Sequence, residues 1–392
     1  MHSFRSILLL PLFGLVAADL PAQNQPETFF AVHCEPNNAN PQVFQGLRAL
    51  VADAEARNIP LSFEFGVTWA EMILANPTML AEVRAWQQSG HAVGGHHHGV
   101  DHPYWDGYTD LHPSQVNRIE PVLGTMADFK AILDPLVGPQ GLQFGGLDDS
   151  EYEWPYGVPF QTHGGRDPDD AVTPREFWLR NHYSTWHVDH AYLDSPIMLA
   201  NLKSLHDQTQ SPNVFGVVTH VVDYQANPAI FQSWFDFLQA KDPTGSNQKT
   251  VMEILAGLPP ALVADRSTLP MSGGQIQLSL RSDATLAGMS YRFLLSLSGS
   301  FPGYDWNGIY DDGVHVGLNP DSWTDFSMEQ ANSAWLPGFF GITGVDGGAA
   351  ATVDTLGPLP PSFSGQRLTF AAVIFDAGGL QFSSNPVEID VQ

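Results

Sequence analysis

The chain has 392 residues, and its 16 Lys and Arg against 42 Asp and Glu give a formal net charge of −26. This acidic excess argues against nucleic acid and anionic membrane surfaces as partners, because both need a surplus of positive charge. Hydrophobic residues make up 43% of the chain and charged residues 15%, a composition typical of a folded protein. The length suggests about two domains, and the 15 histidines are the unusual feature.

The first 22 residues have the pattern of an export signal. Arg5 precedes an apolar run over 7–18, and Ala18 and Ala22 are small residues at expected cleavage positions. The run is shorter than the roughly 20 apolar residues that a membrane span needs. The pattern predicts a signal peptide over 1–22 and a mature protein that is secreted, periplasmic or part of the cell envelope, with no membrane span.

The rest of the chain divides into two patterns. Over 23–258, short apolar runs alternate with amphipathic stretches, and this β/α rhythm predicts an α/β domain. The expected strands include 29–33, 61–65 and 214–220, and the expected helices include 43–57 and 230–238. Over 259–392, strand-like segments are separated by Gly, Ser, Asn and Pro, which predicts an all-β sandwich domain.

Glu35 follows the first expected strand directly. A carboxylate at the C-terminal end of a buried parallel strand lies where α/β proteins place ligands and catalytic groups. The alternative interpretation is a solvated acid in a loop.

Five histidines lie between His91 and His102. His98 and His102 are four residues apart, so a helical turn would place both imidazoles on one side, where they can bind a divalent ion. Together with Glu35 they make a set of two histidines and a carboxylate. Such a set leaves coordination positions open for water and substrate, as a hydrolytic metal site requires.

Three further positions are candidates for the same site. His220 ends a strongly apolar strand, and Asp223 is placed to orient it, although a histidine that caps the sheet is the alternative. His163 and Arg166 either lie beside the metal or belong to a Gly-rich turn. His190 lies in a strand-like segment and is expected to be structural.

Taken in order, these motifs resemble the NodB-like polysaccharide deacetylases of carbohydrate esterase family four. The landmarks of that family are a strand ending in two adjacent Asp, a Gly-His-x-(Ile/Val)-Gly segment leading into His-x-x-x-His, an Arg-x-Pro loop and a late strand ending in His. The corresponding segments here are 90–94 leading into 98–102, 166–168 and 215–220. The resemblance covers roughly residues 27–258.

The resemblance implies a distorted (β/α) barrel and a divalent ion such as Zn²⁺. It implies hydrolysis of an N-acetyl or related acyl group on a carbohydrate, with the metal polarising the acyl oxygen and His220 protonating the leaving amine. Arg166 would belong to the arginine loop. The ligands would be Glu35, His98 and His102, with His96 as an alternative because an insertion displaces the histidine pair.

One departure from the family concerns the catalytic base. Cys34 and Glu35 stand where the family has its two acids, and Cys34 is a poor substitute for a carboxylate base. His33 is an alternative base, although strand alternation points it away from Cys34 and buries it. Asp149 follows another expected strand end and is either the base or part of a Ca²⁺-binding or solvated loop.

Because Cys34 is a poor base, the alternative function is a non-catalytic, metal-containing carbohydrate-binding or envelope protein. The sequence does not predict an oligomeric state.

Overall fold

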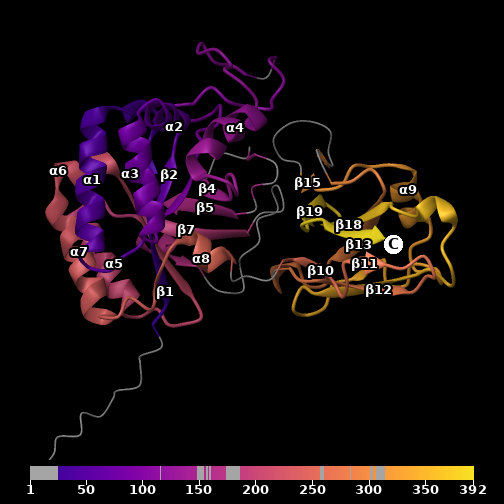
Figure 1. The fold of residues 1–392 in the computed structure, drawn as a ribbon. Coiled ribbons are helices and arrows are strands. Elements are labelled where there is room, and N and C mark those ends of the chain that lie inside the picture. The colour runs from indigo at the N-terminus through magenta and orange to yellow at the C-terminus, as the bar shows by residue number, and fades with distance from the viewer. Residues whose placement is uncertain are drawn as a thin grey trace, which may run out of the picture.

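The structure is a computed structural model that describes residues 25–114, 116–147, 154–155, 158, 160–173, 186–256, 260–282, 284–300, 303–305 and 314–392. The predicted signal peptide and Asp149 lie outside the described residues. Figure 1 shows strands surrounded by helices in the N-terminal part of the chain and a group of β sheets in the C-terminal part. Within the described residues, every helix is too short or too polar to cross a membrane.

The N-terminal part is a closed barrel of seven parallel strands. In chain order these are β1 (Glu27–Cys34), β2 (Leu61–Phe65), β3 (Ala92–His96), β4 (Phe144–Leu147), β5 (Phe160–Gly165), β7 (Trp186–Tyr192) and β8 (Val214–His220). Each pairs in parallel with the next, and β8 pairs back onto β1 along its length, which closes the barrel. Two short strands extend the sheet: β6 (Val172–Thr173), antiparallel to β8, and β9 (Gln248–Lys249), parallel to β1. The predicted distorted (β/α) barrel is confirmed.

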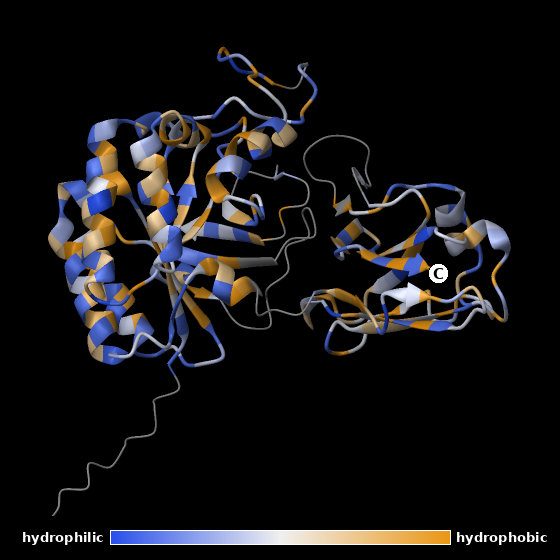
Figure 2. Cartoon of the chain, in the orientation of Figure 1, coloured by the Kyte–Doolittle hydropathy of each residue, from blue (hydrophilic) through white to orange (hydrophobic). Residues whose placement is uncertain are grey.

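Helices connect and cover the strands. They are α1 (Pro41–Glu55), α2 (Val67–Leu74), α3 (Pro77–Gln88), α4 (Met126–Val137), α5 (Pro196–His206), α6 (Val221–Ala226), α7 (Pro228–Lys241) and α8 (Val251–Ala256), with 3-10 turns η1 (Pro36–Asn38) and η2 (Pro168–Ala171). Asn40, Asn76 and Ser195 cap α1, α3 and α5, each followed by a proline in the first turn, which is a strong helix start. The outer helices carry both polar and apolar residues (Figure 2).

The two faces of β1 show where the cores lie. Phe30, Val32 and Cys34 pack in one apolar cluster with residues of α1, between the barrel and its helices. Phe29 and Ala31 belong to a second cluster with residues of β4, β7, β8 and α8. Further along the inward face, toward the C-terminal ends of the strands, the buried residues become polar. The barrel therefore changes from an apolar interior to a polar one at the end where ligand sites are expected.

The C-terminal part is built from β sheets. One has the order β10 (Leu262–Ala264), β12 (Gln275–Leu280), β17 (Ala349–Asp354), and the other the order β11 (Thr268–Leu269), β20 (Val387–Val391), β18 (Arg367–Asp376), β13 (Ser290–Ser296), β16 (Phe340–Ile342), with β19 (Gly379–Ser383) beside β18. A further pair is β14 (Tyr304–Asp305) and β15 (His315–Val316), and 3-10 turns lie at η4 (Ala284–Leu286) and η5 (Pro361–Phe363).

Both larger C-terminal sheets contribute to one apolar cluster, as Ile276 of β12 and Phe293 of β13 illustrate. This arrangement fits the expected β domain. One element was not expected: α9 (Ser322–Glu329), which Asp321 caps through the backbone N–H groups of Trp323 and Thr324. The boundary between 258 and 259 stays a prediction.

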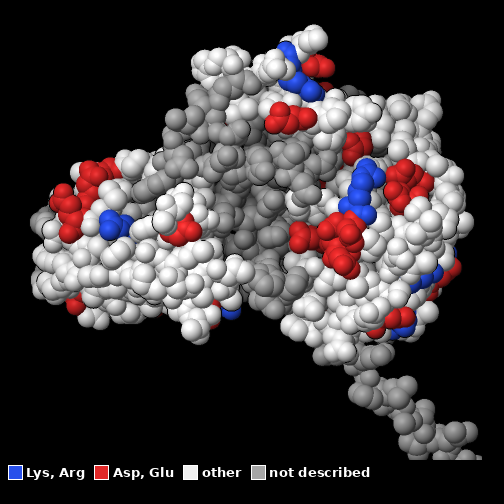
Figure 3. Space-filling view, turned by 180° about the vertical axis from the view of Figure 1, so that it is seen from behind, with Lys and Arg blue, Asp and Glu red and all other residues white. Residues whose placement is uncertain are grey.

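The surface agrees with the acidic composition. On the face seen in Figure 3, acidic side chains form several groups, and Lys and Arg side chains are scattered beside them. This distribution gives the described part of that face no broad basic area of the kind that binds polyanions.

Candidate active site

Glu35 is the first residue after β1, and its carboxylate faces imidazoles from two other parts of the barrel. Oε1 lies 3.3 Å from Nε2 of His96 and 3.1 Å from Nε2 of His220, and Oε2 lies 3.1 Å from Nε2 of His98. His96 ends β3 and His220 ends β8. These side chains meet because the C-terminal ends of parallel strands share one end of the barrel.

The donor atoms of Glu35, His96 and His98 are close enough together to hold a metal ion. They all lie within 4.8 Å of one another, and the two Nε2 atoms are 2.9 Å apart. With metal–ligand distances of about 2.0–2.2 Å, neighbouring ligands around a zinc ion are roughly 3 Å apart. The ring of His98 also contacts the carbonyl of Tyr104 through Nδ1 at 3.0 Å. Donation of the Nδ1 proton to that carbonyl leaves the Nε2 lone pair for a metal.

His102 takes a different position from the one expected. Residues 97–107 contain no helical turn, in keeping with Gly99 and with Pro103, which disfavours helix at the residue before it. The ring of His102 instead lies against that of His98, with centroids 3.7 Å apart, and its Nδ1 accepts the N–H of Tyr104. No group of converging donor atoms among the described residues includes His102. The geometry therefore favours His96 and His98 as the histidine pair.

His220 makes two contacts with carboxylates. Its Nε2 faces Glu35, and its Nδ1 lies 2.8 Å from Oδ2 of Asp223, one turn into α6. Burial by itself lowers the pKa of His220, but the hydrogen bonds with Asp223 and Glu35 outweigh burial and raise the pKa to about 9. Asp223 thus orients the ring, as the sequence suggested, and it also favours the protonated form.

The electrostatics of the other donors are suited to metal binding. Burial by itself raises the pKa of Glu35, but His96, His220 and His98 together lower it far below its usual value. Burial lowers the pKa of His98. A charged carboxylate and a neutral imidazole are the forms in which these groups bind a metal.

A cleft of about 580 Å³ opens at Glu35 and His220, whereas the buried rings of His96 and His98 lie behind its lining. Its lining includes Glu35, His102, Arg166, Tyr192 and His220. The guanidinium carbon of Arg166 lies 5.0 Å from the ring centroid of Tyr192, and its side chain is 74% exposed. Arg166 is thus exposed in the cleft, with Nη1 3.7 Å from Oδ2 of Asp194, whereas Nδ1 of His163 lies 3.6 Å from Oδ1 of Asp189.

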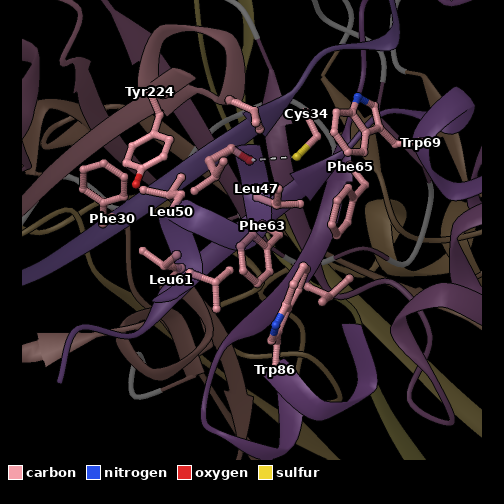
Figure 4. Close-up of a cluster of buried hydrophobic side chains, with 14 of the residues drawn as sticks. Phe30, Cys34, Leu47, Leu50, Leu61, Phe63, Phe65, Trp69, Trp86 and Tyr224 are labelled. Carbon is pink, nitrogen blue, oxygen red and sulfur yellow. Dashed lines mark hydrogen bonds between the residues drawn. The ribbon is translucent and has the colours of Figure 1, made fainter. Parts of the chain in front are cut away.

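Cys34 and His33 point in opposite directions. Cys34 is fully buried beside Leu47 and Phe65 in the outer core (Figure 4), and burial raises the pKa of its thiol. The thiol therefore cannot take the place of a carboxylate base in the cleft. His33 is fully buried inside the barrel, as expected, with Nε2 2.9 Å from Oε2 of Glu64 and Nδ1 3.0 Å from the hydroxyl of Tyr192.

Glu64 and Tyr192 lie beside the site but were not predicted from the sequence. Glu64 is a charged residue in the mostly apolar run Leu61–Phe65. A charged residue in an apolar strand is a sequence signal of a functional position, and it could have identified Glu64. Burial raises the pKa of Glu64 and lowers that of His190 to about 3. The polar interior thus continues inward from the cleft.

Comparison with known proteins gives distant structural neighbours only. No family profile matches the chain, and no curated protein does. A putative polysaccharide deacetylase from Mycobacterium smegmatis aligns with a TM-score of 0.37 and 10% identity, over 60% of this chain and 90% of that one. The catalytic domain of a peptidoglycan N-acetylglucosamine deacetylase from Eubacterium rectale aligns with a TM-score of 0.31 and 11% identity, over 57% and 86%.

A third neighbour has another activity. The 4-alpha-glucanotransferase from Thermococcus litoralis aligns with a TM-score of 0.40 and 12% identity, over 60% of this chain and 39% of that one. Similarity at this level carries no argument about activity. Inference about the reaction must come from the residues of the site.

Proposed function

We propose that the protein is a metal-dependent hydrolase that removes N-acetyl or related acyl groups from a carbohydrate. One observation carries the proposal: the donor atoms of Glu35, His96 and His98 converge beside a cleft, which Glu35 lines together with a histidine that a carboxylate orients. The order of the Gly90–Gly94 segment, the histidine pair and His220 along the chain supports it. Zn²⁺ is the ion proposed, because two imidazoles and a carboxylate form a common set of ligands for catalytic zinc.

The ion would supply Lewis acidity toward the acyl oxygen and lower the pKa of a bound water. The chain supplies the rest. His220 carries a proton on Nε2, the nitrogen that faces the cleft, while Asp223 holds Nδ1. In this position His220 protonates the nitrogen that leaves when the amide is cleaved.

His220 enters the reaction protonated, so its ring has no lone pair with which to take the proton of the attacking water. That proton needs a second acceptor, and Asp149 is the proposed base. Arg166 is proposed to position the sugar, since its exposed guanidinium lines the cleft.

The substrate is proposed to be met outside the cytoplasm. The pattern of residues 1–22 supports export to the cell envelope or beyond. The net charge of −26 suits a neutral or amino-bearing glycan rather than an anionic one.

Acetate release from an N-acetylated oligosaccharide tests the proposal. Zinc-loaded protein should release acetate, and a chelator should abolish release until zinc is restored. His220→Gln should lower kcat by roughly 100-fold or more, since general acid–base catalysis contributes about 10²–10⁴-fold. Retention of metal and of native circular dichroism by that variant would separate lost chemistry from lost folding.

The second candidate function is glycan binding without turnover, and the burial of Cys34 away from the cleft favours it. In that case zinc-loaded protein would bind the oligosaccharide in a calorimetric titration and release no acetate. Turnover that is lost with chelator and with His220→Gln would rule this candidate out.

A further inference from the structure

A second group of metal-binding side chains lies inside the barrel, apart from Glu35, His96 and His98. It consists of His33 of β1, Glu64 of β2 and His190 of β7. All three are fully buried, and one donor atom of each lies within 4.8 Å of the other two. His33 and Glu64 are direct cross-strand neighbours, with Nε2 and Oε2 2.9 Å apart. That separation is close to the spacing of about 3 Å between neighbouring ligands around a small divalent ion.

Within the described part of the chain, two members of this group have polar atoms without a hydrogen bond. Neither ring nitrogen of His190 has one, and the 2.9 Å contact of Oε2 of Glu64 with Nε2 of His33 is an ion pair only when that ring is protonated. A buried polar group left in this state costs about 1–3 kcal/mol. Coordination of a cation by Oε2 and by one nitrogen of His190 would remove that cost.

Other residues orient the group. Thr162 donates a hydrogen bond from its hydroxyl to Oε1 of Glu64 at 2.6 Å, which leaves Oε2 facing His33. The hydroxyl of Tyr192 lies 3.0 Å from Nδ1 of His33. If His33 donates its Nδ1 proton to that hydroxyl, its Nε2 lone pair is available to a metal.

Two glycines make room for these side chains. A Cβ atom added to Gly146 of β4 would lie 2.2 Å from Oε2 of Glu64 and 3.0 Å from Nε2 of His33. One added to Gly164 of β5 would lie 2.8 Å from Cε1 of His190. Residues with side chains at these positions would fill the space into which the donor atoms converge.

We propose that His33, Glu64 and His190 bind a second divalent cation of the zinc class inside the barrel. The donor set of two imidazoles and one carboxylate oxygen is the chemistry that Zn²⁺ prefers. Because all three donors are fully buried, the role of the ion is structural: it links β1, β2 and β7 beneath the cleft. The inference does not depend on the proposed reaction.

Metal analysis of the full chain tests the second site. Protein produced in zinc-supplemented medium and stripped of loosely bound ions should contain two zinc ions per chain. Anomalous difference maps at the zinc edge should show one peak among Glu35, His96 and His98 and a second among His33, Glu64 and His190. Glu64→Gln and His190→Asn should each lose the second peak and keep the first.

His206→Asn is the matched control, because His206 is also buried, with 4% exposure, and its Nε2 contacts the hydroxyl of Thr28 instead. It should keep both ions. Glu35→Gln should lose the first peak and keep the second. The two proposed metal sites are therefore tested independently of each other. A wild-type map without a peak among the three interior donors, or a second peak that survives both interior substitutions, would overturn the inference. The wild-type map decides even if both variants fail to fold.

Discussion

Cys34 and Glu35 are adjacent in the chain, but their side chains lie in different parts of the molecule. Successive residues of a strand point to opposite faces, and here Cys34 enters the outer core while the carboxylate of Glu35, one residue past the strand, enters the cleft. The position that resembles the family's base is therefore a packing position. For this reason His220 is proposed only as the acid that protonates the leaving group, and the base is proposed to be Asp149.

Asp223 is a positioning residue for His220. Asp223→Asn should lower kcat by roughly 10- to 100-fold with little change in KM, because the ring loses its orientation and part of its stabilisation as a cation. Since the hydrogen bond with Asp223 raises the pKa of His220, the alkaline limb of the pH profile of kcat should move to lower pH. Asp236→Asn, which alters an exposed ion pair with Arg57, is the control and should leave the profile unchanged.

His206 makes the barrel sensitive to acid. Burial lowers its pKa from 6.5 to about 4 in the folded protein. Between pH 6.5 and 4 the unfolded chain binds a proton that the folded chain does not, so stability falls as the pH falls through this window and levels off below it. The free energy of unfolding should fall by about 3 kcal/mol through His206, since each unit of pKa difference corresponds to about 1.4 kcal/mol.

Urea unfolding of metal-free protein at pH 7 and pH 4 measures this effect. His206→Gln should lose less stability than the wild type over that interval, because the substituted side chain does not titrate. Equal losses for the two proteins would show that His206 does not carry the acid sensitivity.

At the scale of elements, several strands and helices of the barrel were predictable. The expected strands over 61–65 and 214–220 match β2 and β8, and the expected helix over 43–57 is α1 shifted by two residues. The prediction of a helical turn over 98–102 was wrong, because the four-residue spacing of His98 and His102 takes no account of the residues Gly99 and Pro103. Continuous apolar strands such as β2 do not reveal which face points inward, so the interior position of Glu64 needed the structure.

The close approach of β8 to its neighbours depends on Gly216. A Cβ atom there would lie 2.3 Å from the backbone oxygen of Asp189 and 2.4 Å from Phe29. Gly216→Ala should lower the free energy of unfolding by roughly 1–3 kcal/mol, because neither neighbour can move without shifting a strand or a core ring. Chemical denaturation measures the change.

Gly46→Ala in α1 is the matched control for this substitution. The three atoms nearest to its Cβ would all belong to the side chain of Gln225, which is flexible, and alanine favours the helix by about 1 kcal/mol. Stability should therefore stay within about 1 kcal/mol of the wild type. An equal loss in both variants would contradict the assignment of Gly216 to a close strand contact.

At the scale of the whole molecule, the apolar clusters do not cross the predicted boundary. The clusters of the barrel contain described residues from Phe29 to Leu255, and those of the C-terminal sheets contain residues from Ala261 to Val391. Each part therefore has a core of its own, which is the property of a separate domain. The boundary near residue 258, drawn from the change of sequence pattern, stays a prediction.

Differential scanning calorimetry should show two unfolding transitions. Zinc should raise the midpoint temperature of the barrel transition, because an ion present at 100 times its Kd raises the free energy of unfolding of the state that binds it by about 2.7 kcal/mol. The transition of the C-terminal sheets should not move. A single transition, or an equal shift of both, would contradict independent domains.

The proposed function requires a metal ion held by Glu35, His96 and His98 for the removal of an acyl group from a carbohydrate. Acetate release by metal-free protein, followed as zinc is added to the wild type and to Glu35→Gln, tests this requirement. Wild-type turnover should appear only with zinc and saturate, and Glu35→Gln should stay at least 100-fold lower at every zinc concentration. Full turnover without metal, or wild-type turnover by Glu35→Gln, would contradict it.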